Sequence, residues 1–248
     1  MFNNLTKTYS GRIDPDDRNS PWTKIIELTG SSKRVLEVGC AVGYLSEFLT
    51  VHRGCRVTGI EINPDAARAA LAHCETVIVS DVENGALERA SGPFDVVIFA
   101  DVLEHLRDPW TTLRRSRHLL TDRGYVLISV PNVVHWETRC AFLAGRFNYT
   151  LNGTLDNTHL RFFTHRTAVE LIRNAGFDIE VFDVVFRGPR YWKQNFYRRW
   201  ERPINYVVRR FLRGLFAFQF VYKIRPVLRV QAENHLTIQP TGGRDTRD

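Results

Sequence analysis

Two predicted strands in the first quarter of the chain end in residues that are suited to ligand binding. Residues 35–38 form a short apolar strand that runs into a turn at residues 39–43, and a helix opens directly after the turn. Residues 56–62 form a second strand, which carries Glu61 near its carboxyl end. In open α/β sheets, ligands bind beyond the carboxyl ends of the strands, where a glycine turn and a carboxylate together can hold a nucleoside. The sequence therefore predicts an α/β domain with a nucleoside site at these two strand ends.

The glycines restrict the kind of nucleoside that this turn can hold. A pyrophosphate-binding turn has the pattern G-x-G-x-x-G, in which the second glycine lets the backbone approach the phosphates. Here the frame that starts at Gly39 has Ala41 and Tyr44 in the second and third glycine positions. Glu37 lies two residues before Gly39, and its carboxylate would repel a pyrophosphate but would suit a cationic ligand. A turn that simply joins a strand to a helix is the alternative interpretation.

The pattern E-x-G-x-x-x-G at residues 37–43, followed by Glu61, resembles the first two cofactor motifs of class I S-adenosylmethionine-dependent methyltransferases. In that family the ligand carries an ammonium and a sulfonium, the second acidic residue holds the ribose hydroxyls, and the counterpart of Asp81 binds the adenine amino group. The stretch D-V-L-E-H-L at residues 101–106 resembles the ubiquinone-biosynthesis-like, small-molecule branch of the family. The resemblance implies S-adenosylmethionine as the cofactor. The cofactor-binding residues that it implies are Glu37, Gly39, Cys40, Ala41, Gly43, Glu61, Ile62, Asp81, Val82, Asp101 and Val102.

Near-continuous apolar runs alternate with helical patterns, which indicates a parallel sheet covered by helices on both faces. The resemblance adds a Rossmann-like, seven-stranded, mostly parallel sheet of order 3-2-1-4-5-7-6, with strand 7 antiparallel. The predicted strands are residues 35–38, 56–62, 76–80, 94–100, 124–130, 177–186 and 215–224. The predicted helices are one that starts at Pro21 with Ser20 as its cap, and residues 44–49, 65–72, 110–120 and 164–175.

The chain length of 248 residues suits one α/β domain with additions. We expect residues 1–32 to form an N-terminal cap and first helix, residues 33–229 a single methyltransferase domain, and residues 230–248 a polar tail. The first residues lack the apolar segment of a secretion signal, and no apolar run reaches the roughly 20 residues that span a bilayer. The four cysteines show no metal-ligand spacing. These features predict a cytoplasmic protein with reduced thiols.

The excess positive charge lies in one late segment of the chain. Residues 187–229 contain twelve Lys and Arg against one acid, Glu201, whereas the net charge of the whole chain is +7. Within this segment, residues 187–214 are predicted to form a helical insertion in which aromatic residues and arginines recur at helical spacing. Such a segment can lie in a membrane interface, so residues 190–213 could hold the protein peripherally at the inner face of the membrane. It could equally pack on its own domain, or on a second subunit as in a homodimer.

Methyl transfer from a sulfonium is an in-line displacement, so the protein must align the acceptor and deprotonate it where it is a hydroxyl. His105 is the preferred general base, because imidazole titrates near neutral pH and its loop borders the expected methyl position; the neighbouring Glu104 is a lesser candidate. His159 is the alternative base or an acceptor contact. Each histidine could instead bond the backbone and serve the fold alone. Asn132 could orient an acceptor or could be an ordinary turn residue.

Motifs of several other acceptor classes are absent from the sequence. The fourth strand is not followed by the N/D-P-P-Y stretch of adenine methylation, and no cysteine stands at Pro131-Asn132 for cytosine methylation. Asp101 alone does not make a catechol-type metal site, so no metal is expected. The sequence therefore favours O-methylation, at a hydroxyl or a carboxylate, of a small-molecule, sugar or lipid-linked acceptor, and the absent motifs exclude neither nitrogen nor carbon acceptors. Two alternatives stay open: an RNA methyltransferase that uses residues 187–229, ranked lower because no RNA-binding module is recognisable, and a non-catalytic cofactor-binding scaffold.

Overall fold

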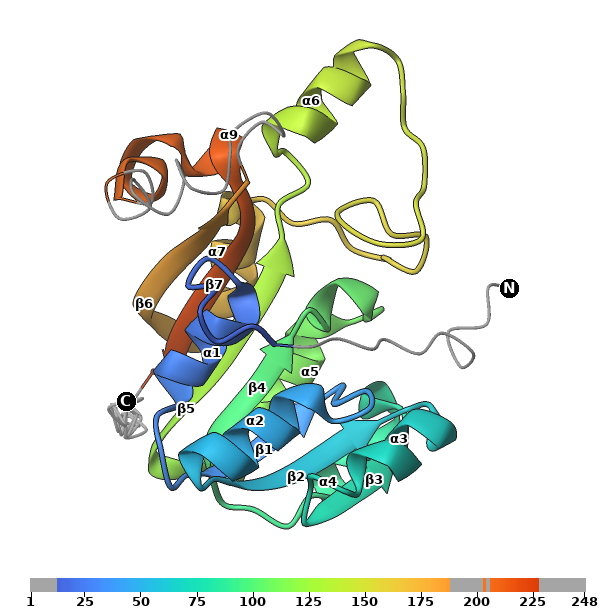
Figure 1. Cartoon of the computed structure of the whole chain (residues 1–248), viewed down its shortest axis with the longest axis vertical. Helices are drawn as coiled ribbons and strands as arrows, with labels where there is room; N and C mark the ends of the chain where they lie inside the picture. The colour runs from blue at the N-terminus through green and yellow to red at the C-terminus, as the bar shows by residue number, and fades with distance from the viewer. Residues whose placement is uncertain (1–12, 188–202, 204–205, 228–248) are drawn as a thin grey trace, which may run out of the picture.

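The computed structural model describes residues 13–187, 203 and 206–227. Its strands are β1 (Arg34–Val38), β2 (Arg56–Glu61), β3 (Thr76–Val79), β4 (Phe94–Ala100), β5 (Leu120–Pro131), β6 (Phe177–Phe186) and β7 (Ala217–Pro226). They form one seven-stranded sheet of order β3-β2-β1-β4-β5-β7-β6 (Figure 1). The pairs among β1 to β5 are parallel, and β7 is antiparallel to both β5 and β6. The predicted fold class and strand order are confirmed.

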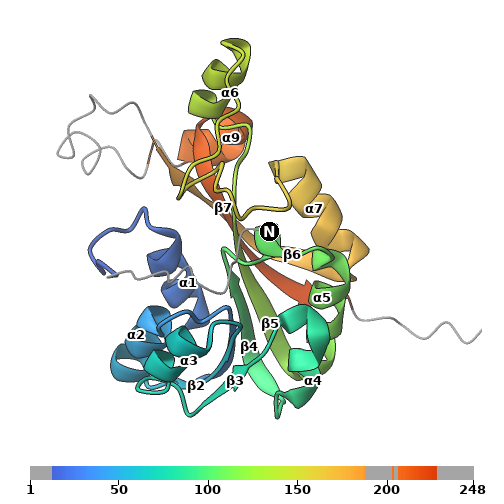
Figure 2. The same ribbon diagram turned by 90° about the vertical axis from the view of Figure 1, so that its right-hand side faces the viewer.

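Helices cover both faces of this sheet, as Figure 2 shows from the edge. On one face lie α1 (Pro21–Thr29), α2 (Tyr44–Arg53) and α3 (Pro64–Ala70); on the other lie α4 (Leu87–Arg89), α5 (Pro109–Ser116) and α7 (His165–Asn174). The central strand β4 shows why both faces are buried. Its side chains alternate between the two cores, with Val97 and Phe99 in one and Val96 and Ile98 in the other. An apolar run without polar alternation therefore specifies a strand between two helical layers.

Three of the local features that differ from the sequence expectations concern α6 (Trp136–Leu143), Ser20 and β5. The helix α6 was not predicted, because it buries only Thr138 and so shows no apolar periodicity that a sequence reading can detect. Ser20 precedes α1, but its side chain makes no capping hydrogen bond, and Pro21 in the first turn is the helix-starting signal. The strand β5 begins at Leu120, before the predicted start at residue 124.

The predicted domain limits at residues 1–32, 33–229 and 230–248 stay predictions. The tail 230–248 lies outside the described residues, as does most of the predicted insertion at 187–214; its described end comprises Val208–Leu212 and α9 (Arg213–Phe216). In the described part of the chain, every helix is too short or too polar to cross a membrane.

Candidate active site

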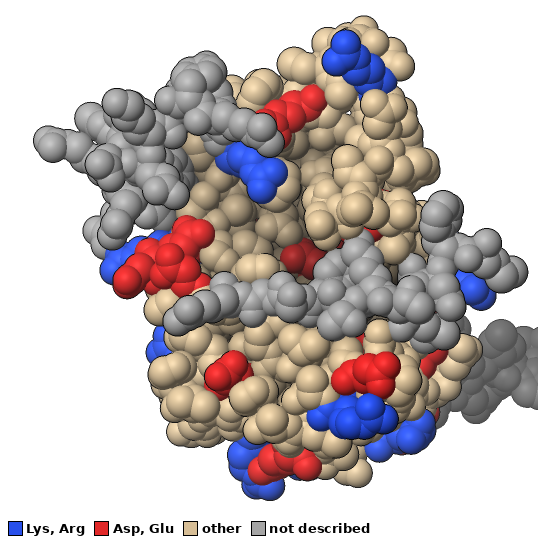
Figure 3. All heavy atoms as spheres, turned by 45° about the vertical axis from the view of Figure 1, so that its right-hand side comes forward, with Lys and Arg blue, Asp and Glu red and all other residues tan. Residues whose placement is uncertain are grey.

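A cavity of about 910 Å³ lies beyond the carboxyl ends of β1, β2 and β4, and Figure 3 shows the surface hollowed there. Both predicted catalytic residues, His105 and His159, line it. The predicted cofactor-binding residues that also line it are Gly39, Ala41, Glu61, Ile62, Asp81, Val82, Asp101 and Val102. Its volume is near the upper end of the range of about 300–1,000 Å³ for small-molecule sites, so it has room for a large ligand.

Glu61 is fixed at the end of β2 by backbone groups. Its Oε2 accepts a hydrogen bond from the N–H of Ala41 at 2.9 Å, and its Oε1 accepts one from the N–H of Asn63 at 2.8 Å. The side chain is buried but lines the cavity. Because an ionised carboxylate offers about four lone-pair positions, two positions remain for hydroxyl groups of a ligand.

The turn that follows β1 requires both of its glycines. Gly39 has a φ of +72°, and a Cβ built there would lie 2.7 Å from a methyl carbon of Val102. Gly43 has a φ of +85°, and its Cβ would lie 3.0 Å from the Cα of Ala70. The first glycine lets the turn pass under the loop after β4, and the second brings α2 against α3.

Three of the predicted cofactor-binding residues, Glu37, Cys40 and Gly43, do not line the cavity. Cys40 is buried in the core, where its Sγ fills the space beside Gly59. The Glu37 carboxylate is buried and accepts a hydrogen bond from Ser46 Oγ at 2.5 Å. Burial raises the pKa of Glu37 to about 8, although the bond from Ser46 lowers it. A direct contact between Glu37 and a cationic ligand stays a prediction.

Asp81 and Val82 form the wall of the cavity beyond β3. Asp81 Oδ1 accepts a hydrogen bond from the N–H of Glu83 at 2.9 Å, and its Oδ2 accepts one from Asn84 Nδ2 at 3.0 Å. Val82 is buried. These bonds hold the Asp81 carboxylate at the cavity wall, where the resemblance places the adenine amino group.

Asp101, at the end of β4, is held by two other strands. Its Oδ1 accepts hydrogen bonds from Ser129 Oγ at 2.8 Å and from Gln219 Nε2 at 2.9 Å. Burial raises the pKa of Asp101, and these two bonds oppose the rise. The contact of Gln219 with Asp101 was not predicted, because only the register of β7 against β5 brings the two residues together.

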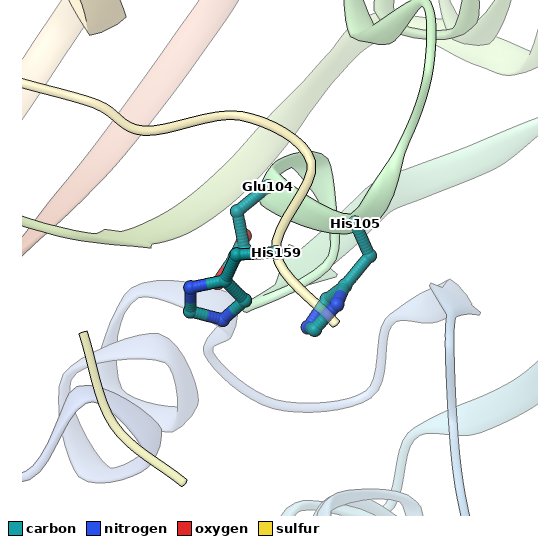
Figure 4. A group of neighbouring side chains, drawn as sticks. All are labelled: Glu104, His105 and His159. Carbon is teal, nitrogen blue, oxygen red and sulfur yellow. The ribbon is translucent and has the colours of Figure 1, made fainter. Parts of the chain in front are cut away.

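Glu104, His105 and His159 all line the cavity and lie close to one another (Figure 4). One potential metal-ligand atom from each side chain lies within 4.8 Å of the other two. Glu104 is 1% exposed, and within the described part of the chain its Oε2 has no hydrogen-bond partner. Burial raises the pKa of Glu104 well above its usual value, and repulsion from Asp101 adds to the rise. A buried carboxylate oxygen without a partner indicates a place for a proton, a hydroxyl or a cation.

Backbone carbonyls fix the tautomers of both histidines. His105 Nδ1 lies 3.3 Å from the carbonyl oxygen of Thr158, and His159 Nδ1 lies 3.1 Å from that of Thr154. Because a carbonyl oxygen only accepts, each Nδ1 carries a proton, and in a neutral ring the lone pair is then on Nε2. Thr158 Oγ1 donates to Asp156 Oδ1 at 2.7 Å and accepts from His105 Nδ1 at 3.1 Å. Nε2 is therefore the nitrogen with which a neutral imidazole takes a proton or binds a metal ion.

The expectation of no metal rested on Asp101 alone, whereas the structure brings together one carboxylate and two imidazoles from a turn and a distant loop. Such a set of nitrogen and oxygen donors suits a divalent first-row ion, and imidazoles that ligate metals commonly donate their other N–H to a carbonyl. The adjacent residues Glu104 and His105 were the only feature of the sequence that indicated this group.

The end of the cavity away from β3 is lined by residues at the ends of β6 and β7. Phe186 and Phe218 supply aromatic surface, and the guanidinium of Arg187 lies 3.6 Å over the ring of Phe218. Asn132, which could orient an acceptor or be an ordinary turn residue, does not line the cavity: it is buried, and its Nδ2 donates to the carbonyl of Ala217 at 2.7 Å. Asn132 therefore joins β5 to β7.

The N-terminal segment closes one side of the cavity. Asp17 and residues 19–22 line it, and Asn19 bonds both backbone groups of Phe186. The Asn19 Nδ2 donates to the Phe186 carbonyl at 2.6 Å, and the Phe186 N–H donates to the Asn19 Oδ1 at 2.9 Å. The segment before α1 is thus attached to the end of β6.

Comparisons with known proteins agree with this geometry. A family model described as "Methyltransferase domain" matches residues 17–181. A ubiquinone biosynthesis O-methyltransferase of Ralstonia nicotianae is 33% identical over 60% of this chain and 64% of its own length, so the chain spans just under two thirds of that relative. The protein of the same name from Cereibacter sphaeroides is 31% identical over 70% of this chain and 71% of its own.

Among solved structures, a S-adenosylmethionine-dependent methyltransferase from Archaeoglobus fulgidus has the same fold. The TM-score is 0.59 at 20% identity, over 86% of this chain and 95% of that one. The strand-end site, the sheet order and the match to the family model lead to one conclusion: the chain belongs to the S-adenosylmethionine-dependent methyltransferase family.

Proposed function

We propose that the protein transfers the methyl group of S-adenosylmethionine to a hydroxyl oxygen of a small-molecule acceptor. The observation that carries this proposal is the group of Glu104, His105 and His159 in the same cavity as the cofactor residues. A sulfonium methyl is already activated, so a hydroxyl acceptor needs mainly alignment and removal of its proton. The names of the Ralstonia and Cereibacter relatives, both O-methyltransferases, support an oxygen acceptor.

In the direct mechanism, the Nε2 lone pair of His105 or His159 takes the proton of the acceptor hydroxyl. The oxygen then attacks the methyl carbon in line with the sulfur, the carbon–sulfur bond breaks, and its electron pair stays on sulfur. The products are the methyl ether and S-adenosylhomocysteine, and the protonated imidazole returns its proton to water. The carbonyls of Thr158 and Thr154 hold both rings in the tautomer that this step needs.

The same three side chains fit a divalent cation, which would replace the base in this reaction. A bound cation would lower the pKa of the acceptor hydroxyl and stabilise the alkoxide. Glu104 would supply a carboxylate oxygen, and each histidine would supply a ring nitrogen. Calorimetry with Mn²⁺ separates the two mechanisms: binding to the wild type and not to Glu104→Gln supports the cation, and full activity after chelation supports the histidine base.

The acceptor itself can be searched for without guessing its identity. We would supply the protein with radiolabelled S-adenosylmethionine and a cell extract, and separate the products by size and by solvent partition. Label in a small or solvent-extractable product supports the proposal. Label in RNA supports the alternative acceptor class. No label anywhere, with normal binding of S-adenosylhomocysteine, supports a cofactor-binding scaffold.

An amphipathic, lipid-linked acceptor is the finer form of this proposal. The aromatic side chains of Phe186 and Phe218, together with the guanidinium of Arg187, line the end of the cavity opposite the cofactor residues. These groups suit a molecule with apolar surface and a polar or anionic group. A cytoplasmic protein held peripherally at the inner face of the membrane, and a homodimer, stay predictions; most of residues 190–213 lie outside the described residues.

A further inference from the structure

Four buried polar side chains form a hydrogen-bonded group next to the turn that follows β1. Ser46 Oγ donates to the carboxylate of Glu37 at 2.5 Å, and Cys74 Sγ donates to Ser46 Oγ at 3.1 Å. Cys40, in the turn itself, joins the group through a hydrogen bond between the two thiols. Neither cysteine lines the cavity. The methyl transfer proposed above gives the two thiols no role.

Gly59 on β2 makes room for both sulfur atoms. A Cβ built at Gly59 would lie 2.6 Å from Cys40 Sγ and 3.4 Å from Cys74 Sγ. Cys40 follows β1 and Cys74 precedes β3, and β2 lies between these two strands (Figure 1). The sulfurs therefore meet over the position of β2 that has no side chain. Both thiols are free, and no group has to leave before they can be joined.

The two thiols differ in how readily they react. Hydrogen bonds with Cys40 and Ser46 lower the pKa of Cys74, although burial opposes this shift. The hydrogen bond with Cys74 and burial both raise the pKa of Cys40. Cys74 is also the less buried of the two, at 8% exposed against 1%. Because the thiolate is the form that attacks an oxidant, Cys74 is the thiol that reacts first.

We propose that Cys40 and Cys74 form a reversible disulfide, and that this bond weakens cofactor binding when the protein meets a peroxide. The Cys74 thiolate attacks one oxygen of hydrogen peroxide, the oxygen–oxygen bond breaks, and Cys74 becomes a sulfenic acid. The hydroxide that leaves takes up the proton that Cys74 had lost. The sulfur of Cys40 then attacks that of Cys74, and the sulfenic oxygen leaves as water with the proton of Cys40. Two thiols and one peroxide thus give one disulfide and two waters.

The turn that carries Cys40 also positions the carboxylate of Glu61. The N–H groups of Gly39 and Cys40 both donate to the carbonyl of Ile60, at 2.8 and 3.1 Å. The next N–H, that of Ala41, donates to Glu61 at 2.9 Å. A disulfide holds two sulfurs closer than a hydrogen bond between thiols does, so its formation shifts the turn. Loss of the bond from Ala41 to Glu61 should lower the affinity for S-adenosylhomocysteine about tenfold.

Oxidation of a Cys140→Ser protein tests the proposal, because this substitution removes the exposed thiol and leaves the three buried ones. We would treat the protein with hydrogen peroxide, locate disulfides by mass spectrometry of unreduced peptides, and measure the affinity for S-adenosylhomocysteine by calorimetry. We expect a bridge between Cys40 and Cys74 and a tenfold weaker affinity. Dithiothreitol should restore the original affinity.

A second measurement needs no substitution at either cysteine of the pair. If the disulfide weakens binding of S-adenosylhomocysteine tenfold, saturating S-adenosylhomocysteine must favour the dithiol by the same factor. The midpoint potential of the pair in glutathione buffers should then rise by about 30 mV, since a tenfold change in a two-electron equilibrium corresponds to this shift. The test therefore stands even where a cysteine variant fails to fold.

Matched variants in the Cys140→Ser protein show whether the pair is responsible. Cys74→Ser keeps a polar group beside Ser46 but cannot form the bridge, so peroxide should not change its affinity for S-adenosylhomocysteine. Cys55→Ser removes another buried thiol, whose Sγ lies 3.9 Å from the carbonyls of Gly30 and Arg53. This control should lose affinity in peroxide as its parent does.

Three results would overturn the proposal. They are thiols that resist peroxide in the folded protein, a bridge that leaves cofactor affinity unchanged, and an equal loss of affinity in Cys74→Ser and its parent. None of these measurements involves an acceptor, so the switch can fail while the proposed function stands. A protein that switches its affinity but methylates no hydroxyl would contradict the proposed function alone.

Discussion

The two ends of the cavity are built in different ways. At the proposed cofactor end, the backbone of adjacent strand ends does most of the positioning: the N–H groups of Ala41 and Asn63 hold Glu61. At the proposed acceptor end, side chains from a turn after β4, a loop after α6 and the ends of β6 and β7 meet, and loop carbonyls orient the two histidines. A strand-end site is fixed by local sequence, whereas a site assembled from loops depends on the whole fold. The two ends should therefore respond separately to mutation.

The strongest test of this separation is His105→Asn. Loss of the imidazole should lower kcat by about 10²–10³-fold, because general base catalysis contributes on this scale, and cation binding would be lost as well. The affinity for S-adenosylhomocysteine, measured by calorimetry, should not change. His52→Asn, on the exposed side of α2, is the control. A parallel loss of cofactor affinity would show that the two ends are not independent.

Glu37 tests how the cofactor end is built, because its carboxylate is buried and does not line the cavity. Its pKa in the folded protein is about 8, against 4.5 as the reference value. The unfolded chain loses this proton above the reference value, whereas the folded protein keeps it until about pH 8. Glu37 therefore makes unfolding easier as the pH rises through this window.

Replacement of Glu37 by Gln should remove this pH dependence. The free energy of unfolding of the wild type should fall relative to that of Glu37→Gln by about 3 kcal/mol between pH 5 and pH 8, at 1.36 kcal/mol per pKa unit. Denaturant titrations of both proteins at several pH values measure the difference. Curves that stay parallel across this range would show that Glu37 is ionised in the folded protein.

Glu61→Ala addresses the cofactor end directly. The substitution removes the proposed ribose contact and leaves the N–H groups of Ala41 and Asn63 without their acceptor, so the affinity for S-adenosylhomocysteine should fall about 100-fold. Glu47→Ala on α2, whose side chain is 57% exposed, is the control. If Glu61→Ala binds S-adenosylhomocysteine as tightly as the wild type does, Glu61 does not hold the ribose.

The contrast between the two ends also explains what the sequence could predict. Apolar strands and helix starts are local, so residues 35–43 and 56–62 predicted both the sheet and the glycine turn that the structure contains. The order of the strands came from the resemblance to a family. Gln219 could not be predicted to reach Asp101, because that contact depends on the register of β7. For the same reason the sequence left the role of Asn132 open: only the fold shows that it bonds Ala217.

Thr158 tests whether the acceptor end is oriented by its loop. Thr158→Val keeps the shape of the side chain but removes the hydroxyl that links His105 to Asp156, so kcat should fall about tenfold while cofactor affinity stays the same. Thr158→Ser restores the hydroxyl and should recover most of the activity. If valine and serine behave alike, the loop positions His105 through the carbonyl of Thr158 alone.

The smallest effect is expected where the two ends are joined, at Asn19. Asn19→Ala removes both hydrogen bonds between the N-terminal segment and the backbone of Phe186. Because a hydrogen bond contributes roughly 0.5–1.5 kcal/mol, S-adenosylhomocysteine should dissociate about fivefold faster in stopped-flow measurements. Asn174→Ala, at the exposed end of α7, should leave the rate unchanged. An unchanged rate for Asn19→Ala would mean that this segment lines the cavity without retaining its ligand, and that the cofactor end holds the nucleoside through its strand ends alone.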